Sequence, residues 1–289
     1  MNPFFSRHRH RSLRAFTRIE ALALLAGGAL LLALGLPGLA GVRSLSTAQV
    51  CFGNQRQLIT AWLLFAEDHS GRLPGNPDGG DAINWANTNL FWVVGWLDNS
   101  TFRPDNTNTA ILRNSQLGPY FDSVSIFKCP SDLSLSRGRR GDPRVRSVAM
   151  NPYVGTRFNG AAGSENRPYT AGYRQFLTLA SIVDPAPSKC FVFIEEREDS
   201  INDPWFPIDM SNYIPARPAD AVIVDYPGEY HDGGAVLSFV DGHVELWRWQ
   251  DGRTRPALRP GQLLPLGLPS PNNPDVLRLQ SAASSLVQR

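Results

Sequence analysis

The chain has 289 residues, of which 42% are hydrophobic, so it is long enough for one large domain or two smaller ones with a buried core. Its 28 basic and 26 acidic residues give a formal net charge of +2. This balance excludes the concentrated basic face that nucleic-acid binding needs. The 25 Gly and 23 Pro residues exclude a long coiled coil and predict many loops.

The N-terminus joins a basic segment to an apolar one. Residues 1–15 contain Arg7, Arg9, Arg11 and Arg14 but no acid, and residues 21–42 are uncharged and apolar. A helix needs about 20 such residues to cross the hydrocarbon core, and positive flanks stay cytoplasmic. The pattern predicts a basic leader over 1–15 and a transmembrane helix over 16–42. It also predicts a single pass through the cytoplasmic membrane, with the residues after Val42 outside the cytoplasm.

Three kinds of targeting segment fit this N-terminus: a plain anchor, a cleaved secretory signal and a prepilin leader. Small residues at Gly38-Leu39-Ala40 suit a secretory cleavage site. Glu20 stands at the start of the apolar run, where a carboxylate is costly in lipid. Such a residue is retained where something needs it, which favours the prepilin leader.

The segment Ala15-Phe16-Thr17-Arg18-Ile19-Glu20, with the apolar run after it, resembles the prepilin motif G-F-T-L-I-E-L of type IV pilins and type II secretion pseudopilins. The resemblance implies that a prepilin peptidase cleaves between Ala15 and Phe16 and methylates the new amino terminus. It also implies that Glu20 neutralises the amine of a neighbouring subunit within a filament. Ala15 and Arg18 depart from the Gly and the apolar residue of that motif.

Further blocks along the chain are similar to a pseudopilin-like group. They are the segment 51–73, LGPYFDSVSIFKCPSD, VRSVAMNPYVG and the segment from His231 to Trp249, which fits an H-x9-DG pattern ending at Asp241-Gly242. The blocks occur in this order over most of residues 16–250. The implied fold class is α+β and pilin-like, with a long N-terminal helix, transmembrane in its first half, packed on a loop-rich head with an antiparallel β-sheet.

The rest of the chain divides into three segments. Apolar spacing predicts an amphipathic continuation of the helix over 43–73, ending near Gly71. Residues 74–250 read as an α+β head, with strands at 91–97 and 190–195 and a hairpin whose Asp-Gly turn lies between 235–240 and 243–249. The Pro-rich residues 251–289 show no apolar period and are expected to be a flexible tail.

The three cysteines are Cys51, Cys129 and Cys190. Disulfides persist outside the cytoplasm, so we expect a Cys51–Cys129 bridge that ties the helix to the head. Cys190 lies in a predicted core strand and is the expected odd residue. The alternative is three reduced, buried cysteines, because the connectivity does not follow from sequence.

Candidate metal ligands gather near the predicted hairpin. His231, Asp241, His243 and Glu245 offer imidazole and carboxylate groups that could hold Ca²⁺ or another divalent cation. The alternative is structural, with Asp241 shaping the turn and His231 hydrogen-bonded across to it. No other cofactor is expected.

No G-x-S-x-G, HExxH or phosphate-binding loop occurs, so the chain is not expected to be an enzyme. The expected function is that of a structural pseudopilin-like subunit of a type II secretion or type IV pilus-like apparatus. Its expected partners are a prepilin peptidase, other pilin-like subunits through the N-terminal helix, and the membrane. Its expected location is the bacterial cytoplasmic (inner) membrane, crossed once, with the N-terminus cytoplasmic and the head periplasmic or extracytoplasmic. The alternatives are a signal-anchored or secreted extracytoplasmic binding domain and an envelope enzyme.

Overall fold

The computed structural model describes residues 17–98, 103–158 and 168–287, and within helix α1 the side chains of residues 28–46 lie outside that description. The chain divides into two units, Met1–Arg43 and Ser44–Arg289. Helix α1 (Arg18–Asp68) contributes residues to both. The second unit, the head, contains the other helices and all the strands in the described part of the chain.

The part of α1 that belongs to the head buries one face. Cys51, Leu58, Trp62 and Phe65 follow the helical spacing of i, i+7, i+11 and i+14, and each is at most 5% exposed. The helix ends just before Gly71, whose φ of 82° is readily adopted by glycine and whose N–H donates to the Ala66 carbonyl at 2.7 Å. The amphipathic segment therefore ends where the sequence predicts.

A four-stranded antiparallel sheet forms the centre of the head. Its strand order is β4 (Val148–Met150), β6 (Phe191–Glu195), β8 (Gly234–Phe239) and β9 (Val244–Arg248). Strands β8 and β9 form the hairpin that Asp241-Gly242 predicts, with Ser238 opposite Val244. Strand β6 confirms the strand expected at 190–195. The α+β class with an antiparallel sheet is therefore confirmed.

Short elements surround this sheet. The remaining α-helices of the described residues are α2 (Gly79–Ile83), α3 (Ala110–Arg113) and α4 (Pro274–Ser281), and several short 3₁₀ helices lie between them. The small sheets pair β1 (Asn76–Pro77) with β5 (Arg157–Phe158), β2 (Leu135–Arg137) with β3 (Arg140–Pro143), and β7 (Val222–Ile223) with β10 (Leu268–Pro269). Most of the other head residues are turns and irregular segments, as the Gly and Pro content predicts.

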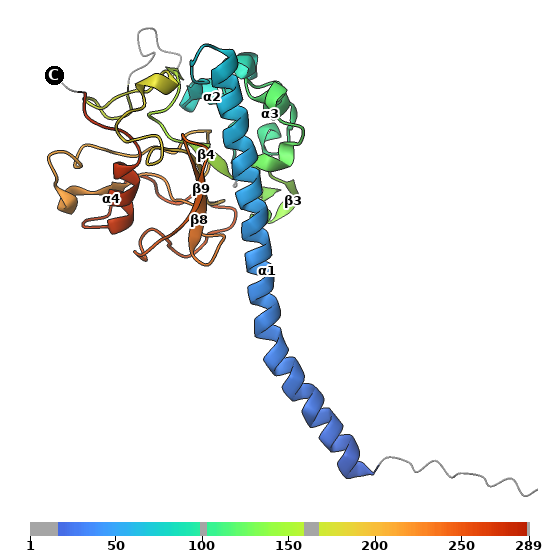
Figure 1. The fold of residues 1–289 in the computed structure, drawn as a ribbon. Coiled ribbons are helices and arrows are strands. Elements are labelled where there is room, and N and C mark those ends of the chain that lie inside the picture. Colours follow the sequence, from blue (N-terminus) through green and yellow to red (C-terminus); the bar gives the residue numbers. More distant parts are fainter. Residues whose placement is uncertain (1–16, 99–102, 159–167, 288–289) are drawn as a thin grey trace, which may run out of the picture. The chain divides into compact units, whose positions relative to one another are not determined.

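The central sheet lies between α1 and α4 (Figure 1), and a hydrophobic cluster packs against each of its faces. In one, Trp62 of α1 packs with Met150 and Phe193 of the sheet. In the other, Leu279 of α4 packs with Ile194 and other sheet residues. The sheet therefore has α1 over one face and α4 over the other. Side chains that point from the sheet toward either helix are buried.

The expected transmembrane helix over 16–42 is not found. Side chains are described for residues 17–27 and 47–68 of α1, and neither stretch reaches the roughly 20 apolar residues that a span requires. Within the described residues, then, no helix has the length and apolar character to span a membrane. This finding contradicts two expectations. They are the transmembrane first half of the helix and the single-pass location in the inner membrane with a periplasmic head.

Two further expectations differ from the structure. Residues 91–97, expected as a strand, are buried but irregular, because their backbone N–H groups bond to separate segments, at Gly75, Ala82 and Asn202. Residues 251–287, expected within a flexible tail, instead contain β10 and α4 and bury Leu264 and Leu279. Pro and Gly here shape turns, and the buried apolar side chains hold the segment against the head.

Candidate functional site

Four potential metal-ligating side chains meet in the interior of the head. Cys51, Cys129, Glu195 and His231 place one ligand atom each within 4.8 Å of all the others. Each residue is at most 2% exposed. Elsewhere in the described ranges no other group of three or more such residues meets this criterion. The cluster is therefore the strongest candidate site in the molecule.

Separate parts of the fold deliver these side chains. Cys51 lies on the buried face of α1, and Glu195 is the last residue of β6. Cys129 follows a short 3₁₀ turn, and its N–H donates to the Ser147 hydroxyl at 2.7 Å just before β4. The cluster thus depends on contacts between residues far apart in the chain.

His231 enters the cluster from the turn that precedes β8. Its N–H donates to the Gly234 carbonyl at 3.2 Å, and the Gly234 N–H donates back to the His231 carbonyl at 3.1 Å. Asp232 and Gly233 between them have φ values of 53° and 75°. This tight turn directs the imidazole inward, whereas a strand would alternate its side chains between two faces.

The polar atoms form a continuous chain of contacts. The Cys51 thiol donates to the Cys129 sulfur at 2.9 Å, and the Cys129 sulfur lies 3.5 Å from Nε2 of His231. The same Nε2 lies 3.3 Å from a Glu195 carboxylate oxygen, which also accepts the Val236 N–H at 2.8 Å. The four side chains therefore form one continuous run of polar contacts.

These contacts shift the titration of the cluster. Burial raises the pKa of Cys129, but hydrogen bonds from Cys51 and His231 outweigh it and lower the pKa overall. The hydrogen bond that Cys51 donates, together with burial, raises the Cys51 pKa. Burial lowers the pKa of His231, yet its bonds to Cys129 and Glu195 raise it to about 10. These bonds favour ionisation of Cys129 and protonation of His231 relative to the free side chains.

The geometry does not match a nucleophile–histidine–acid triad. Such a triad needs the nucleophile on one ring nitrogen and the orienting acid on the other. Here Cys129 and Glu195 both face Nε2 of His231, while Nδ1 is buried without a hydrogen-bond partner. The cluster is therefore suited to holding the sulfurs, as a bridge or as ligands, more than to nucleophilic catalysis.

The expected disulfide partners lie side by side. The Cys51 and Cys129 sulfurs are 2.9 Å apart, and both residues are free thiols in the structure, as is Cys190. A disulfide would need about 2.05 Å between the sulfurs. The proximity fits the expected pairing, and the bond itself stays a prediction.

The four expected metal ligands do not come together. His231 points into the cysteine cluster, whereas Asp241, His243 and Glu245 gather at the partly exposed end of the β8–β9 hairpin. There His243 bonds Asp241 through Nδ1 and Glu245 through Nε2, at 3.2 Å, and its ring stacks on Phe239. These three side chains therefore hydrogen-bond to one another within the hairpin.

The N-terminal site residues are placed only in part. Ala15 and Phe16, where cleavage and methylation are expected, lie outside the described residues. The Glu20 carboxylate accepts the Thr17 N–H at 2.8 Å and the Thr17 hydroxyl at 2.9 Å, and the Glu20 N–H donates to that hydroxyl at 3.3 Å. This reciprocal capping box begins α1, and these bonds lower the Glu20 pKa.

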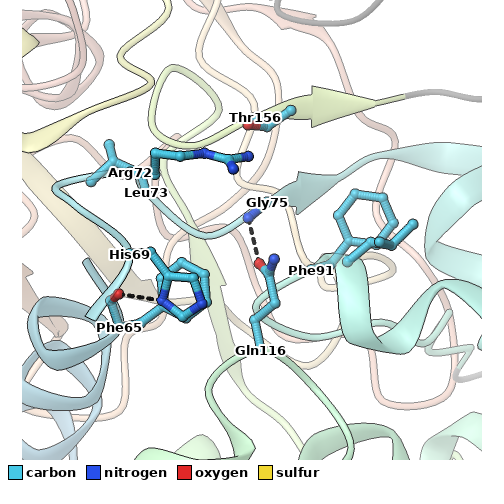
Figure 2. Close-up of a pocket in the computed structure, with 9 residues that line it drawn as sticks. Phe65, His69, Arg72, Leu73, Gly75, Phe91, Gln116 and Thr156 are labelled. Atoms are coloured by element: carbon cyan, nitrogen blue, oxygen red, sulfur yellow. Dashed lines mark hydrogen bonds between the residues drawn. The ribbon is translucent and has the colours of Figure 1, made fainter. Parts of the chain in front are cut away.

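A hollow beside the C-terminal end of α1 is one of several cavities in the head (Figure 2). In its wall His69 stacks on Phe65 and contacts the Phe65 carbonyl through Nδ1 at 2.7 Å. The Gly75 N–H donates to the Gln116 side-chain oxygen at 2.7 Å. Since these polar groups already bond within the wall, the hollow presents no convergent reactive set.

Sequence reasoning missed Glu195 as a site residue. It ends the apolar run CFVFIE, and a carboxylate that directly continues a buried strand is the signal that could have identified it. Gln55, one helical turn after Cys51, was missed as well. It is 2% exposed, and both its amide atoms lack a hydrogen-bond partner.

Comparison with known proteins adds no relative. No protein-family model matches the chain, and no match is found among the curated proteins or the solved structures. Function must therefore be argued from the residues and their geometry.

Proposed function

We propose that the chain is a structural, pilin-like subunit of a type II secretion or type IV pilus-like apparatus, which assembles through the N-terminal part of α1. The observation that carries the proposal is an apolar helical segment that stays uncovered. Every described side chain from Thr17 to Gly27 is exposed. The prepilin-like motif at residues 15–20 supports the same role.

The exposed segment carries several large apolar side chains. Ile19, Leu22, Leu24 and Leu25 are 80%, 66%, 64% and 71% exposed. Contiguous exposed apolar surface marks an interaction site. We assign a second copy of the same segment as its cover. Arg18 and Glu20 lie within one turn and offer opposite charges to a neighbouring copy.

Site-specific photocrosslinking in the full-length protein tests this assignment. A photoreactive residue in place of Leu24 is expected to form covalent dimers and higher multimers. The matched control is Leu133 in the head, which is 82% exposed but belongs to the other unit. Equal self-crosslinking at both positions, or none at Leu24, would contradict assembly through the helix.

Two variants can separate the proposed pairing of Glu20 with a neighbouring subunit from its part in the capping box of α1. Glu20→Gln keeps an acceptor for Thr17, because Gln also serves in a capping box, but it removes the charge. Thr17→Ala weakens the cap and keeps the charge. If Glu20 pairs with a neighbouring amine, Glu20→Gln reduces Leu24 crosslinking well below wild type, while Thr17→Ala reduces it less. The reverse order would mean that Glu20 acts only as a cap.

The proposed partners are a prepilin peptidase and other pilin-like subunits. Mass spectrometry of the mature amino terminus, in cells with an active peptidase, is expected to find N-methylated Phe16. A terminus at Gly41 would instead establish a secreted domain. The proposed role includes no catalytic step.

A further inference from the structure

We propose that Cys51, Cys129, Glu195 and His231 bind a structural zinc ion that fastens α1 to the central sheet. The inference is independent of the assembly role, since it concerns the interior of the head and is read out by metal content. Zinc in proteins takes four ligands from thiolate, imidazole and carboxylate groups, and its structural sites are closed to solvent. All four residue types and their burial fit that description.

The contact distances are close to the edges of a zinc tetrahedron. With zinc–sulfur bonds of about 2.3 Å and zinc–nitrogen or zinc–oxygen bonds of about 2.0–2.1 Å, neighbouring ligand atoms lie about 3.6 Å apart for sulfur and nitrogen, and about 3.4 Å for nitrogen and oxygen. The Cys129 sulfur lies 3.5 Å from Nε2 of His231. The same Nε2 lies 3.3 Å from the Glu195 carboxylate. These two contacts already have the separations that zinc requires, and the other ligand atoms lie within 4.8 Å of one another.

The two sulfurs must move slightly apart to bind zinc. A zinc tetrahedron places them about 3.8 Å apart, whereas they now lie 2.9 Å apart, in a thiol hydrogen bond. The difference of about 0.9 Å is within reach of side-chain rotation at Cys51 and Cys129. Loss of the shared proton removes the hydrogen bond that holds them close, because zinc binds thiolates.

Gln55 supplies an independent observation. Its side-chain amide is buried, neither of its polar atoms has a hydrogen-bond partner, and it lines the same small cavity as Cys51, Cys129 and Glu195. A buried amide without a partner costs on the order of 1–3 kcal/mol. Outer-shell groups that hydrogen-bond to the metal ligands are a usual part of a metal site. A zinc site therefore gives Gln55 a function that an apolar core does not.

A disulfide between Cys51 and Cys129 is the competing state. A disulfide would explain why the two sulfurs lie close together. It would not explain why the Glu195 carboxylate, the His231 imidazole and the Gln55 amide are buried beside them. A divalent cation, by contrast, neutralises two of the three negative charges carried by two thiolates and a carboxylate. Thiolate ligands select zinc over calcium, which prefers oxygen.

Metal analysis of the full-length chain tests the proposal. Protein prepared under reducing conditions, stripped with a chelator and incubated with Zn²⁺, is expected to retain one zinc per chain and to melt at a higher temperature than the stripped form. Co²⁺ in place of zinc is expected to give the thiolate-to-cobalt charge-transfer band. That spectrum needs no variant and therefore reports ligation even if substitutions in the cluster prevent folding.

Four variants sharpen the test. Cys51→Ser and Glu195→Gln are expected to lose the stoichiometric zinc. Cys190→Ser removes a buried thiol outside the cluster and should keep it. Gln55→Leu keeps all four ligands and should weaken zinc binding about 10-fold. Reduced wild type without zinc or a cobalt band overturns the proposal, as does native protein whose Cys51 and Cys129 are recovered as a disulfide.

Discussion

Arg146 illustrates how single buried charges organise the loops of the head. It is 1% exposed, and its guanidinium donates to the carbonyls of Val148 and Asp203, both at 2.9 Å, and of Gly95 at 3.3 Å. Burial lowers its pKa to about 10. One planar group with several donors thus joins three segments of the chain.

Arg146→Lys is expected to destabilise the head by about 2–4 kcal/mol. A lysine ammonium cannot reproduce the guanidinium fork, so buried carbonyls lose their donors. The measurement is the urea midpoint of unfolding. Arg140→Lys is the matched control, because Arg140 is exposed on β3 and its replacement should change stability by less than about 0.5 kcal/mol. Equal midpoints for the two variants would show that the carbonyl contacts carry little energy.

Asp203 gives the head a pH dependence of defined sign. Burial raises its pKa to about 6, although the N–H groups of Trp205 and Gly79 and the charge of Arg146 favour ionisation. Between about pH 4 and pH 6 the folded chain keeps a proton that the unfolded chain has released. The contribution of Asp203 to the free energy of unfolding therefore falls as pH rises through this window, by at most about 3 kcal/mol.

Urea unfolding at several pH values between 4 and 6 measures this effect. Asp203→Asn removes the titrating group, so its stability should fall less steeply with pH than that of wild type. The variant is also expected to be less stable overall, because an amide cannot accept both the Trp205 and the Gly79 N–H as the carboxylate does. Parallel pH profiles would assign the raised pKa to another residue.

At the scale of secondary structure, elements specified by local signals are those that the sequence predicts. The hairpin follows from Asp241-Gly242 between two β-prone runs, and the end of α1 follows from Gly71. Residues 91–97 have an equally apolar composition yet form no strand, because distant loops bind their backbone. An apolar run indicates burial but does not fix which segment completes its hydrogen bonds.

The candidate site divides in the same way. Cys51 and Cys129 could be paired from their residue type and their place in the chain. Glu195 and His231 join them only through the register of β6 and β8 and a tight turn. Cys129 and His231 are 102 positions apart, so no spacing pattern links them. The sequence therefore predicted metal ligands along a single hairpin, whereas the structure brings the potential ligands together from separate segments around the sheet.

Gly242 makes the hairpin testable as an element. Its φ is 88°, in the left-handed region, and an added Cβ would meet only Leu63 at an ordinary 3.6 Å. Gly242→Ala is therefore expected to cost about 1–2 kcal/mol through backbone strain alone. Gly252→Ala is the control, since its φ is not in the left-handed region and no atom lies within 4 Å of its added Cβ. Similar thermal midpoints for both variants would contradict the strain.

Over the whole molecule, the C-terminal segment closes the head. Val276, Leu279, Ala282 and Ala283 are at most 4% exposed. The Ala283 carbonyl accepts from the Asn151 side chain at 3.0 Å, and the Ala282 carbonyl accepts the Phe191 N–H at 3.1 Å. The last residues of the chain thus complete the hydrogen bonding of β6 and of the loop after β4. Composition alone could not show this, because Pro and Gly occur in ordered turns as well as in flexible tails.

Deletion of residues 274–289 is the test at this scale. It removes four buried apolar side chains and the acceptors of Phe191 and Asn151, and a domain has only about 5–15 kcal/mol of stability in total. The truncated chain is therefore expected to lose cooperative unfolding, whereas a flexible tail could be removed without effect. Leu279→Ala should cost about 2–4 kcal/mol. Val287→Ala, at a side chain that is 53% exposed, should cost less than 1 kcal/mol, as roughly expected for surface sites. If the truncated chain unfolds with the wild-type midpoint, α4 does not belong to the core of the head.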